Sequence, residues 1–232
     1  MSVAPIGSGR VLAAPRAAAI AGVVFAVLFS VGVGLIRLAV PADPSDPGSW
    51  LGESDRRNAV SLALNLIPFA GIAFLWFMGV VRSRLGAAED QFFATVFLGS
   101  GLLFVAMLFN TAGAAGGLLE AVSSGNVRLS DSETYYASRG TTYVLMNVFG
   151  IKMAGVFMFS TCTIGLKRAI FPRWIAYLGY GCAVVLLLII TNWPWIALVF
   201  PLWILLLSAY LLVADFRGHH DESTTDQAAR PA

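Results

Sequence analysis

The chain has 232 residues, of which 58% are hydrophobic and only 12% are charged, and its mean hydropathy is +0.78. A soluble domain carries about 25% charged residues, so this composition excludes an ordinary soluble domain and indicates a membrane protein. The formal net charge of +2 is spread over separate loops, which leaves no basic patch for nucleic acid.

Six apolar segments follow one another along the chain. A helix needs about 20 apolar residues to cross a hydrocarbon core about 30 Å thick. The sequence therefore predicts an all-α, polytopic membrane helix bundle of six transmembrane helices over residues 17–215, between disordered cytoplasmic tails at 1–16 and 216–232. The segments are 17–40, 58–81, 92–119, 141–166, 175–190 and a sixth that follows a turn at 192–195 and ends near Ala214.

Six crossings place both termini on one side of the membrane. Nine Lys and Arg residues belong to the loops and tails of that side, and four belong to the opposite side. Membrane proteins keep the excess of basic residues in the cytoplasm, so both termini are expected to be cytoplasmic. Only two of the 15 basic residues are lysine. That bias, with abundant Ala and Gly, is typical of GC-rich bacterial genomes and indicates a bacterial inner membrane.

Small residues recur at every fourth position of the first segment. Such stripes let helix backbones approach closely in lipid, where no hydrophobic force drives helices together. Packing within one chain is the favoured interpretation, and a membrane-protein partner or a homo-oligomer is the alternative. The residues of the stripe are Ala18, Gly22, Ala26, Ser30 and Gly34.

One lysine, Lys152, lies near the middle of the fourth segment. A cation at the bilayer centre costs roughly 2.5 to 3.5 kcal/mol on insertion scales. From about ten residues inside either end, at ~1.5 Å per residue, the lysine stem cannot reach bulk water. The ammonium is therefore expected to have a partner or water inside the protein, either at a functional site or in a structural contact.

Four more features lie at a comparable depth: Asn65 and Pro68 in the second segment, Asn110 in the third and Asn147 in the fourth. Pro68 lacks an N–H, so it is expected to kink its helix and to free a carbonyl. Together these groups predict a polar, ligand-binding pocket in the outer half of the bundle, around Lys152. The alternative is that the asparagines only hold helices in register.

Two charged residues near the external ends of their helices, Arg37 and Glu120, are expected to form a structural ion pair. The only histidines, His219 and His220, belong to the C-terminal tail, so no metal site and no cofactor are predicted. The lipid bilayer is the expected partner.

Three functions from different classes stay open. The favoured one is a non-catalytic accessory or structural membrane protein, because packing features outnumber chemical ones. The first alternative is a transport or binding protein whose outward-facing pocket holds a small polar or anionic solute on Lys152. The second alternative is a lipid-modifying membrane enzyme, for which only Lys152 and Arg37 offer chemistry.

Overall fold

The computed structural model describes residues 14–41, 43, 45–85, 91–124, 133–188 and 195–228, and every regular element among them is helical. Seven α-helices are joined by short 3₁₀ turns (η1, η3) and one π-helical segment (η2). Their bounds are α1 Ala14–Ala39, η1 Ser49–Gly52, α2 Ser54–Leu85, α3 Gln91–Ser123, α4 Glu133–Tyr143, η2 Val144–Gly150, α5 Ile151–Lys167, α6 Arg173–Leu188, η3 Ile196–Leu198 and α7 Val199–Ala228.

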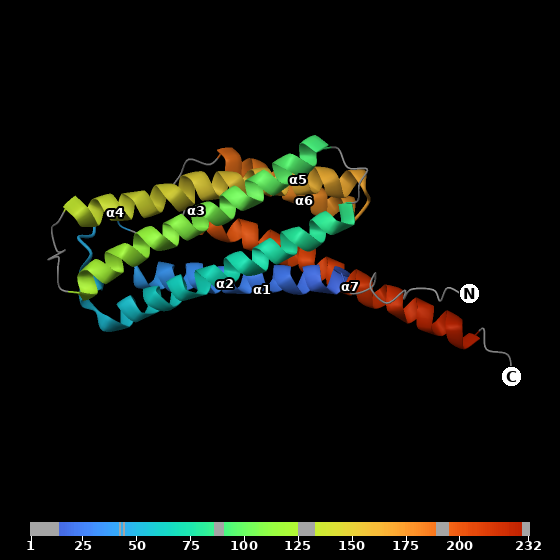
Figure 1. Cartoon of the computed structure of the whole chain (residues 1–232), viewed down its shortest axis with the longest axis horizontal. Helices are drawn as coiled ribbons and strands as arrows, with labels where there is room; N and C mark the ends of the chain where they lie inside the picture. The colour runs from blue at the N-terminus through green and yellow to red at the C-terminus, as the bar shows by residue number, and fades with distance from the viewer. Residues whose placement is uncertain are drawn as a thin grey trace, which may run out of the picture.

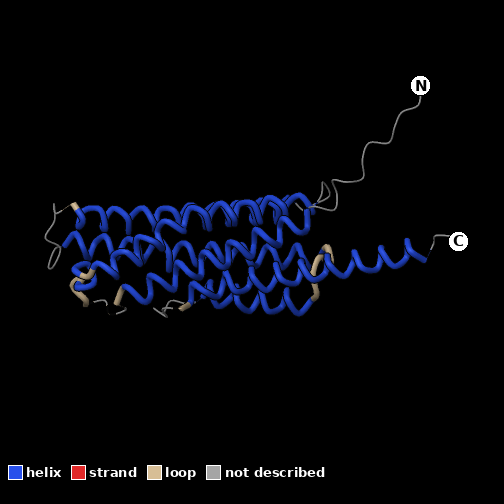
Figure 2. Tube along the Cα trace, turned by 90° about the horizontal axis from the view of Figure 1, so that it is seen from below, coloured by secondary structure: helices blue, strands red, loops and turns tan. Residues whose placement is uncertain are grey.

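The helices form one bundle with nearly parallel axes (Figures 1 and 2). Five helical stretches are long and apolar enough to cross a membrane, and the sixth, α6, is apolar but has only 16 residues. The predicted polytopic membrane helix bundle is therefore confirmed. α4, η2 and α5 run on as one stretch of 35 residues, which begins at Glu133, before the apolar segment that starts at Thr141.

α1 begins and α7 ends at the same end of the bundle, here called the terminal end (Figure 1). The opposite end is called the distal end. α7 continues as a helix to Ala228, beyond the boundary expected at residue 215. Residues 1–13 and 229–232 of the two expected tails lie outside the described residues.

Phenylalanine rings fill the centre of the bundle. Phe25 of α1 packs on Phe74 of α2 with ring centroids 4.8 Å apart, and Phe104 of α3 packs edge-on against Phe200 of α7 at 4.9 Å. All four rings are buried. Tilted and edge-on pairs suit the aromatic quadrupole, so this cluster joins the helices into one core and closes the middle of the bundle.

The helices differ in length, and this shapes the distal end. At ~1.5 Å per residue, α2, α3 and the α4–α5 stretch are each about 50 Å long, more than the roughly 40–45 Å of a whole bilayer. α6 is only about 24 Å long by the same measure. Figure 1 shows that the α6–α7 hairpin stops short of the distal ends of α3 and α4. The long helices therefore frame a space beyond that hairpin.

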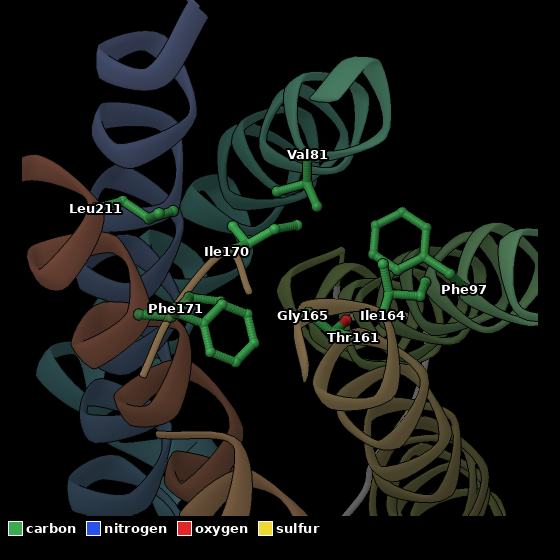
Figure 3. Close-up of a pocket in the computed structure, with 9 residues that line it drawn as sticks. Val81, Phe97, Thr161, Ile164, Gly165, Ile170, Phe171 and Leu211 are labelled. Atoms are coloured by element: carbon green, nitrogen blue, oxygen red, sulfur yellow. The ribbon is translucent and has the colours of Figure 1, made fainter. Parts of the chain in front are cut away.

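A small void lies near the terminal end, where the α5–α6 connection meets α2, α3 and α7 (Figure 3). Its volume is about 20 Å³, close to the space that a single water molecule needs. The one polar side chain that lines it, Thr161, already donates its hydroxyl to the Phe157 carbonyl at 2.7 Å. The void offers a ligand no polar partner and is best described as a packing defect.

Candidate functional site

A larger cavity, of about 480 Å³, opens in the distal half of the bundle. It is enclosed by α1, α2, α3 and the α4–η2 stretch, and Ala197 of η3 contributes to its floor. Small-molecule sites commonly occupy roughly 300–1,000 Å³, so the cavity is large enough for a ligand. It is the candidate functional site.

The wall formed by α2 and α3 is apolar except for Thr111. It continues onto the α1 residues that lie deepest in the bundle. This apolar wall is made of Phe29, Val33, Val60, Leu64, Ile67, Leu108, Ala112, Ala115 and Leu118.

The opposite side of the cavity is polar. Arg37 projects from α1, and the α4–η2 stretch contributes Arg139, Thr142, Tyr143 and Asn147. Neither Asp nor Glu occurs among the described residues that line the cavity. The cavity therefore combines an apolar wall with a polar side that carries positive charge and no compensating carboxylate.

Arg37 is the exceptional group of this polar side. Its side chain is half-buried, and Tyr143 lines the same cavity. Within the described part of the chain, the guanidinium has no hydrogen-bond or ion-pair partner. An arginine carries five N–H donors in a fixed fork that matches a carboxylate or a phosphate. A half-buried and unpaired guanidinium is therefore a ready site for an anion.

The loop between α1 and α2 folds over the distal end of the cavity as a roof. The Trp50 indole N–H donates to the Tyr135 hydroxyl at 3.2 Å, and both side chains are buried, with 5% and 1% exposure. Gly48 has a φ of 90°, and a Cβ at this position would lie 2.9 Å from the Tyr135 ring. Only glycine fits both the left-handed backbone and the close approach.

Arg139 ties this roof to α4. Its guanidinium donates to the backbone carbonyls of Pro41 at 3.0 Å, Asp43 at 2.8 Å and Asp46 at 3.3 Å. Hydrogen bonds from the Ser45 backbone N–H and hydroxyl, with the nearby Arg139 charge, hold the pKa of the Asp43 carboxyl below its ordinary value. Arg139 is thus occupied by the loop, whereas Arg37 is free to meet a ligand.

Replacing Arg139 with glutamine is expected to loosen the roof. Losing hydrogen bonds from a charged donor costs about 2 kcal/mol, which corresponds to roughly 30-fold faster local opening. Hydrogen exchange at the backbone amide of Leu51, which donates to the Gly48 carbonyl at 2.9 Å, measures the effect. Arg82→Gln, an exposed change at the terminal end, is the control. Unchanged exchange in Arg139→Gln would show that the loop is held by other contacts.

The π-helical segment η2 forms part of the polar side. The Ile151 N–H donates to the Met146 carbonyl, five residues back, so the turn is wider than in an α-helix. Asn147 lies in this wide turn, donates its own side-chain amide to the Tyr143 carbonyl at 3.2 Å and lines the cavity. π-helical turns inside α-helices are frequent at functional sites, which agrees with the position of η2.

The structure does not assemble the pocket that the sequence predicted around Lys152. Asn65 and Asn110 are exposed on the outside of the bundle. Each donates its side-chain amide to its own helix, to the Ser61 carbonyl at 2.9 Å and to the Ala106 carbonyl at 2.8 Å. A polar side chain that finds a partner one turn back needs no neighbouring helix. Of the three asparagines, only Asn147 lines the cavity.

Lys152 also departs from its predicted place. It does not line the cavity, and its ammonium donates to the carbonyls of Leu186 at 3.1 Å and Leu187 at 2.5 Å. These residues belong to the last turn of α6, whose carbonyls have no N–H partner within the helix. The positive charge also meets the negative end of the helix dipole. In this structure Lys152 caps α6.

The expected ion pair between Arg37 and Glu120 does not form between these two described residues. Arg37 turns into the cavity, and Glu120 is exposed near the distal end of α3. An ion pair does join Arg56 to Glu53 at 2.9 Å. Pro68 is exposed within α2, which remains helical on both sides of it.

Several cavity residues escaped the sequence analysis. Tyr135, Arg139 and Tyr143 recur at every fourth position, a spacing that places them on one helix face, and the sequence analysis assigned none of them to a site. Trp50 carried no signal in the sequence that pointed to a site. The helical spacing of the three α4 residues is the signal that could have revealed a polar face turned into the protein.

A comparison of the chain with protein-family models, with curated proteins and with solved structures finds no match. The fold and the cavity therefore define the class of protein to which the chain belongs. It is a multi-pass membrane helix bundle with an amphipathic cavity in its distal half.

Proposed function

We propose that this protein binds an anionic amphiphile, one hydrocarbon chain with a carboxylate or phosphate head, in the distal cavity. The observation that carries the proposal is the unpaired Arg37 guanidinium in a cavity with no lining carboxylate among its described residues. The proposal keeps the outward-facing binding site expected from the sequence but centres it on Arg37, because Lys152 caps α6.

The polar side matches the head of such a ligand. The planar fork of Arg37 can donate two parallel hydrogen bonds to a carboxylate or phosphate. The Tyr143 hydroxyl and the Asn147 side chain line the same side and can add donors. Charge-assisted hydrogen bonds contribute about 1.5–3 kcal/mol each, so the head group has a defined position beside α1 and η2.

The apolar wall matches the tail. Phe29, Ile67 and Leu108 are buried side chains at the deep end of the cavity, farthest from the roof. Each methylene that leaves water for such a surface contributes about 0.8 kcal/mol, so several methylenes contribute as much as the head group. A small polar solute would leave this wall unused, which favours an amphiphile.

The proposal also places the protein in a bacterial inner membrane, with the terminal end in the cytoplasm and the distal cavity on the periplasmic side. The excess of basic residues in the loops of the terminal end supports this orientation. The role that follows is non-catalytic: the protein holds a lipid-derived anion at the outer surface, for itself or for a partner protein.

The test is binding of oleate and of oleoyl lysophosphatidate to the purified protein in phosphatidylcholine nanodiscs. Arg37→Gln is expected to weaken binding of both probes by about 10- to 100-fold, the loss of one charge-assisted contact. Arg37→Lys should retain part of the affinity because it keeps the charge without the fork. Arg56→Gln, which removes an arginine at the same end that does not line the cavity, is the matched control.

A zwitterionic probe of the same chain length, oleoyl lysophosphatidylcholine, distinguishes the contribution of the head group to the binding affinity from that of the tail. Binding that is equal for all three probes and unchanged in Arg37→Gln would overturn the proposal, because the arginine would then contribute nothing. Competition by inorganic phosphate at the concentration of the lipid probe would also overturn it, because the tail would then be unnecessary.

A further inference from the structure

Most residues that line the cavity are buried or half-buried, and the exposed ones form a single row along one helix. Among the described lining residues, only Tyr136, Gly140 and Val144 are exposed, the first at 43% and the last at 40%. They lie four residues apart along α4 and the start of η2, so they share one face over about 12 Å. Residues that both line a cavity and are exposed mark its opening, which therefore runs along the side of the bundle.

The described residues close the other directions. Trp50, Tyr135 and Leu118 are buried at the distal end, where Arg139 fastens the loop above them. At the deep end, Phe29 and Ala197 are buried as well. A ligand that came straight from the external water would have to displace the roof.

The opposite edge of the side opening is α1. This helix packs extensively on α2 and α7, whereas α4 and η2 pack on α3. Among the described residues, a hydrogen bond joins this stretch to the loop that follows α1, from Arg139 to the Pro41 carbonyl. The α6–α7 hairpin, which packs beside α5, stops short of the distal end (Figure 1). The side opening therefore lies between α1 and α4–η2, above that hairpin.

The height of the opening matches the outer surface of a bilayer. Val144 and Tyr136 lie 23 and 31 residues from Lys167, the last residue of α5. At ~1.5 Å per residue these separations are about 35 and 47 Å. A bilayer is roughly 40–45 Å thick with its head groups, so the opening lies at the outer head-group layer when Lys167 lies at the inner one.

From these observations we infer that the opening is a lateral portal, bounded by Tyr136, Gly140 and Val144, through which a single-chain anionic lipid enters from the outer leaflet. The inference rests on the proposed function and adds the source of the ligand. The head group of the lipid passes Gly140 at the same depth as the head groups of the surrounding lipids, and its tail reaches the apolar wall without crossing water.

Gly140 is the position at which the portal can be tested. A Cβ at Gly140 would meet no atom within 4 Å, so a larger side chain there extends into open space without straining the helix. Tryptophan at this position is expected to obstruct the portal. Gly113 of α3 is the matched control, because it is also exposed, also has open space around its Cβ and does not line the cavity.

The experiment uses oleoyl lysophosphatidate with a photoreactive diazirine in its tail, incorporated in phosphatidylcholine vesicles that contain the full chain. Crosslinked peptides are mapped by mass spectrometry. The wild-type protein and Gly113→Trp are expected to be labelled at the apolar wall, near Ile67 and Leu108. In Gly140→Trp, labelling of the apolar wall is expected to be at least 10-fold lower than in wild type, while labelling of the outer, lipid-facing surface is unchanged.

The outcomes separate the portal from the binding site. Full labelling of the wall in Gly140→Trp, with full loss in Arg37→Gln, would overturn the portal and leave the binding function standing. Labelling of the wall that is equal in wild type and Arg37→Gln would overturn the proposed function itself. Faster labelling in Arg139→Gln, from a probe supplied in water, would assign the route to the roof and would also overturn the portal.

Discussion

Replacement of Lys152 with methionine is expected to lower the free energy of unfolding by about 3 kcal/mol and to leave binding in the distal cavity unchanged. The ammonium donates to the Leu186 and Leu187 carbonyls, and methionine fills similar space without a donor. A buried polar group left without a partner costs about 1–3 kcal/mol, and two carbonyls are affected here. Removing the buried charge itself offsets part of this loss.

The position of these carbonyls explains the size of the effect. α6 ends at Leu188, opposite the start of α5, and the last carbonyls of a helix have no intrahelical donor. In an apolar surrounding water does not replace the missing donor. Lys152 supplies it, and its own charge is stabilised by the dipole of the helix that it caps.

Thermal or denaturant unfolding in detergent, together with the oleate assay, measures both halves of the prediction. Lys167→Met is the natural control, because it removes the chain's other lysine from an exposed position, where the ammonium lies 4.4 Å from the centre of the Phe93 ring. A Lys152→Met protein that is as stable as wild type, or that loses oleate binding while it stays folded, would contradict the capping role.

The second large effect is expected at Gly22. A Cβ at this position would lie 2.1 Å from the Ser208 hydroxyl oxygen and 2.9 Å from the Phe77 ring. Overpacking of a tight contact costs about 1–3 kcal/mol, so Gly22→Ala should destabilise the contact between α1 and α7 by about 2 kcal/mol. Gly34→Ala on the same small-residue stripe is the control, because a Cβ there meets no atom within 4 Å.

Ser208 offers a specific rescue of that defect. It is fully buried, and its hydroxyl has no hydrogen-bond partner in the described structure. Ser208→Ala alone is therefore expected to leave the free energy of unfolding unchanged or to raise it slightly, because it removes a buried polar atom that forms no hydrogen bond. Combined with Gly22→Ala it should recover part of the lost stability, measured by the same unfolding assay. Strictly additive effects would show that the two side chains do not collide.

The membrane helices were predictable because hydropathy and length determine them almost alone. The sequence did not predict which face of each helix turns into the protein, as Asn65 and Asn110 illustrate. A lipid-facing surface is as apolar as a helix contact, so the sequence pattern does not separate inside from outside. An asparagine that bonds to its own helix, four residues back, can face either way.

The cavity was unpredictable for a related reason. Its roof depends on Arg139, which bonds to backbone carbonyls that lie more than 90 residues earlier in the chain. Backbone carbonyls are present at every residue, so such contacts leave no complementary pattern in the sequence. Arg37 was assigned to Glu120 because opposite charges near the same surface are the simplest pairing, whereas the structure turns the arginine inward.

The shortness of α6 has a consequence for the lipids that surround the protein. The described part of α6 has 16 residues and is about 24 Å long, some 6 Å less than an average hydrocarbon core. A bilayer adjusts to a short hydrophobic span by thinning locally, at a cost of fractions of a kcal/mol per ångström. Lipids beside α6 are therefore expected to be compressed, with their polar ends drawn toward the midplane on the flank of the protein where that helix lies.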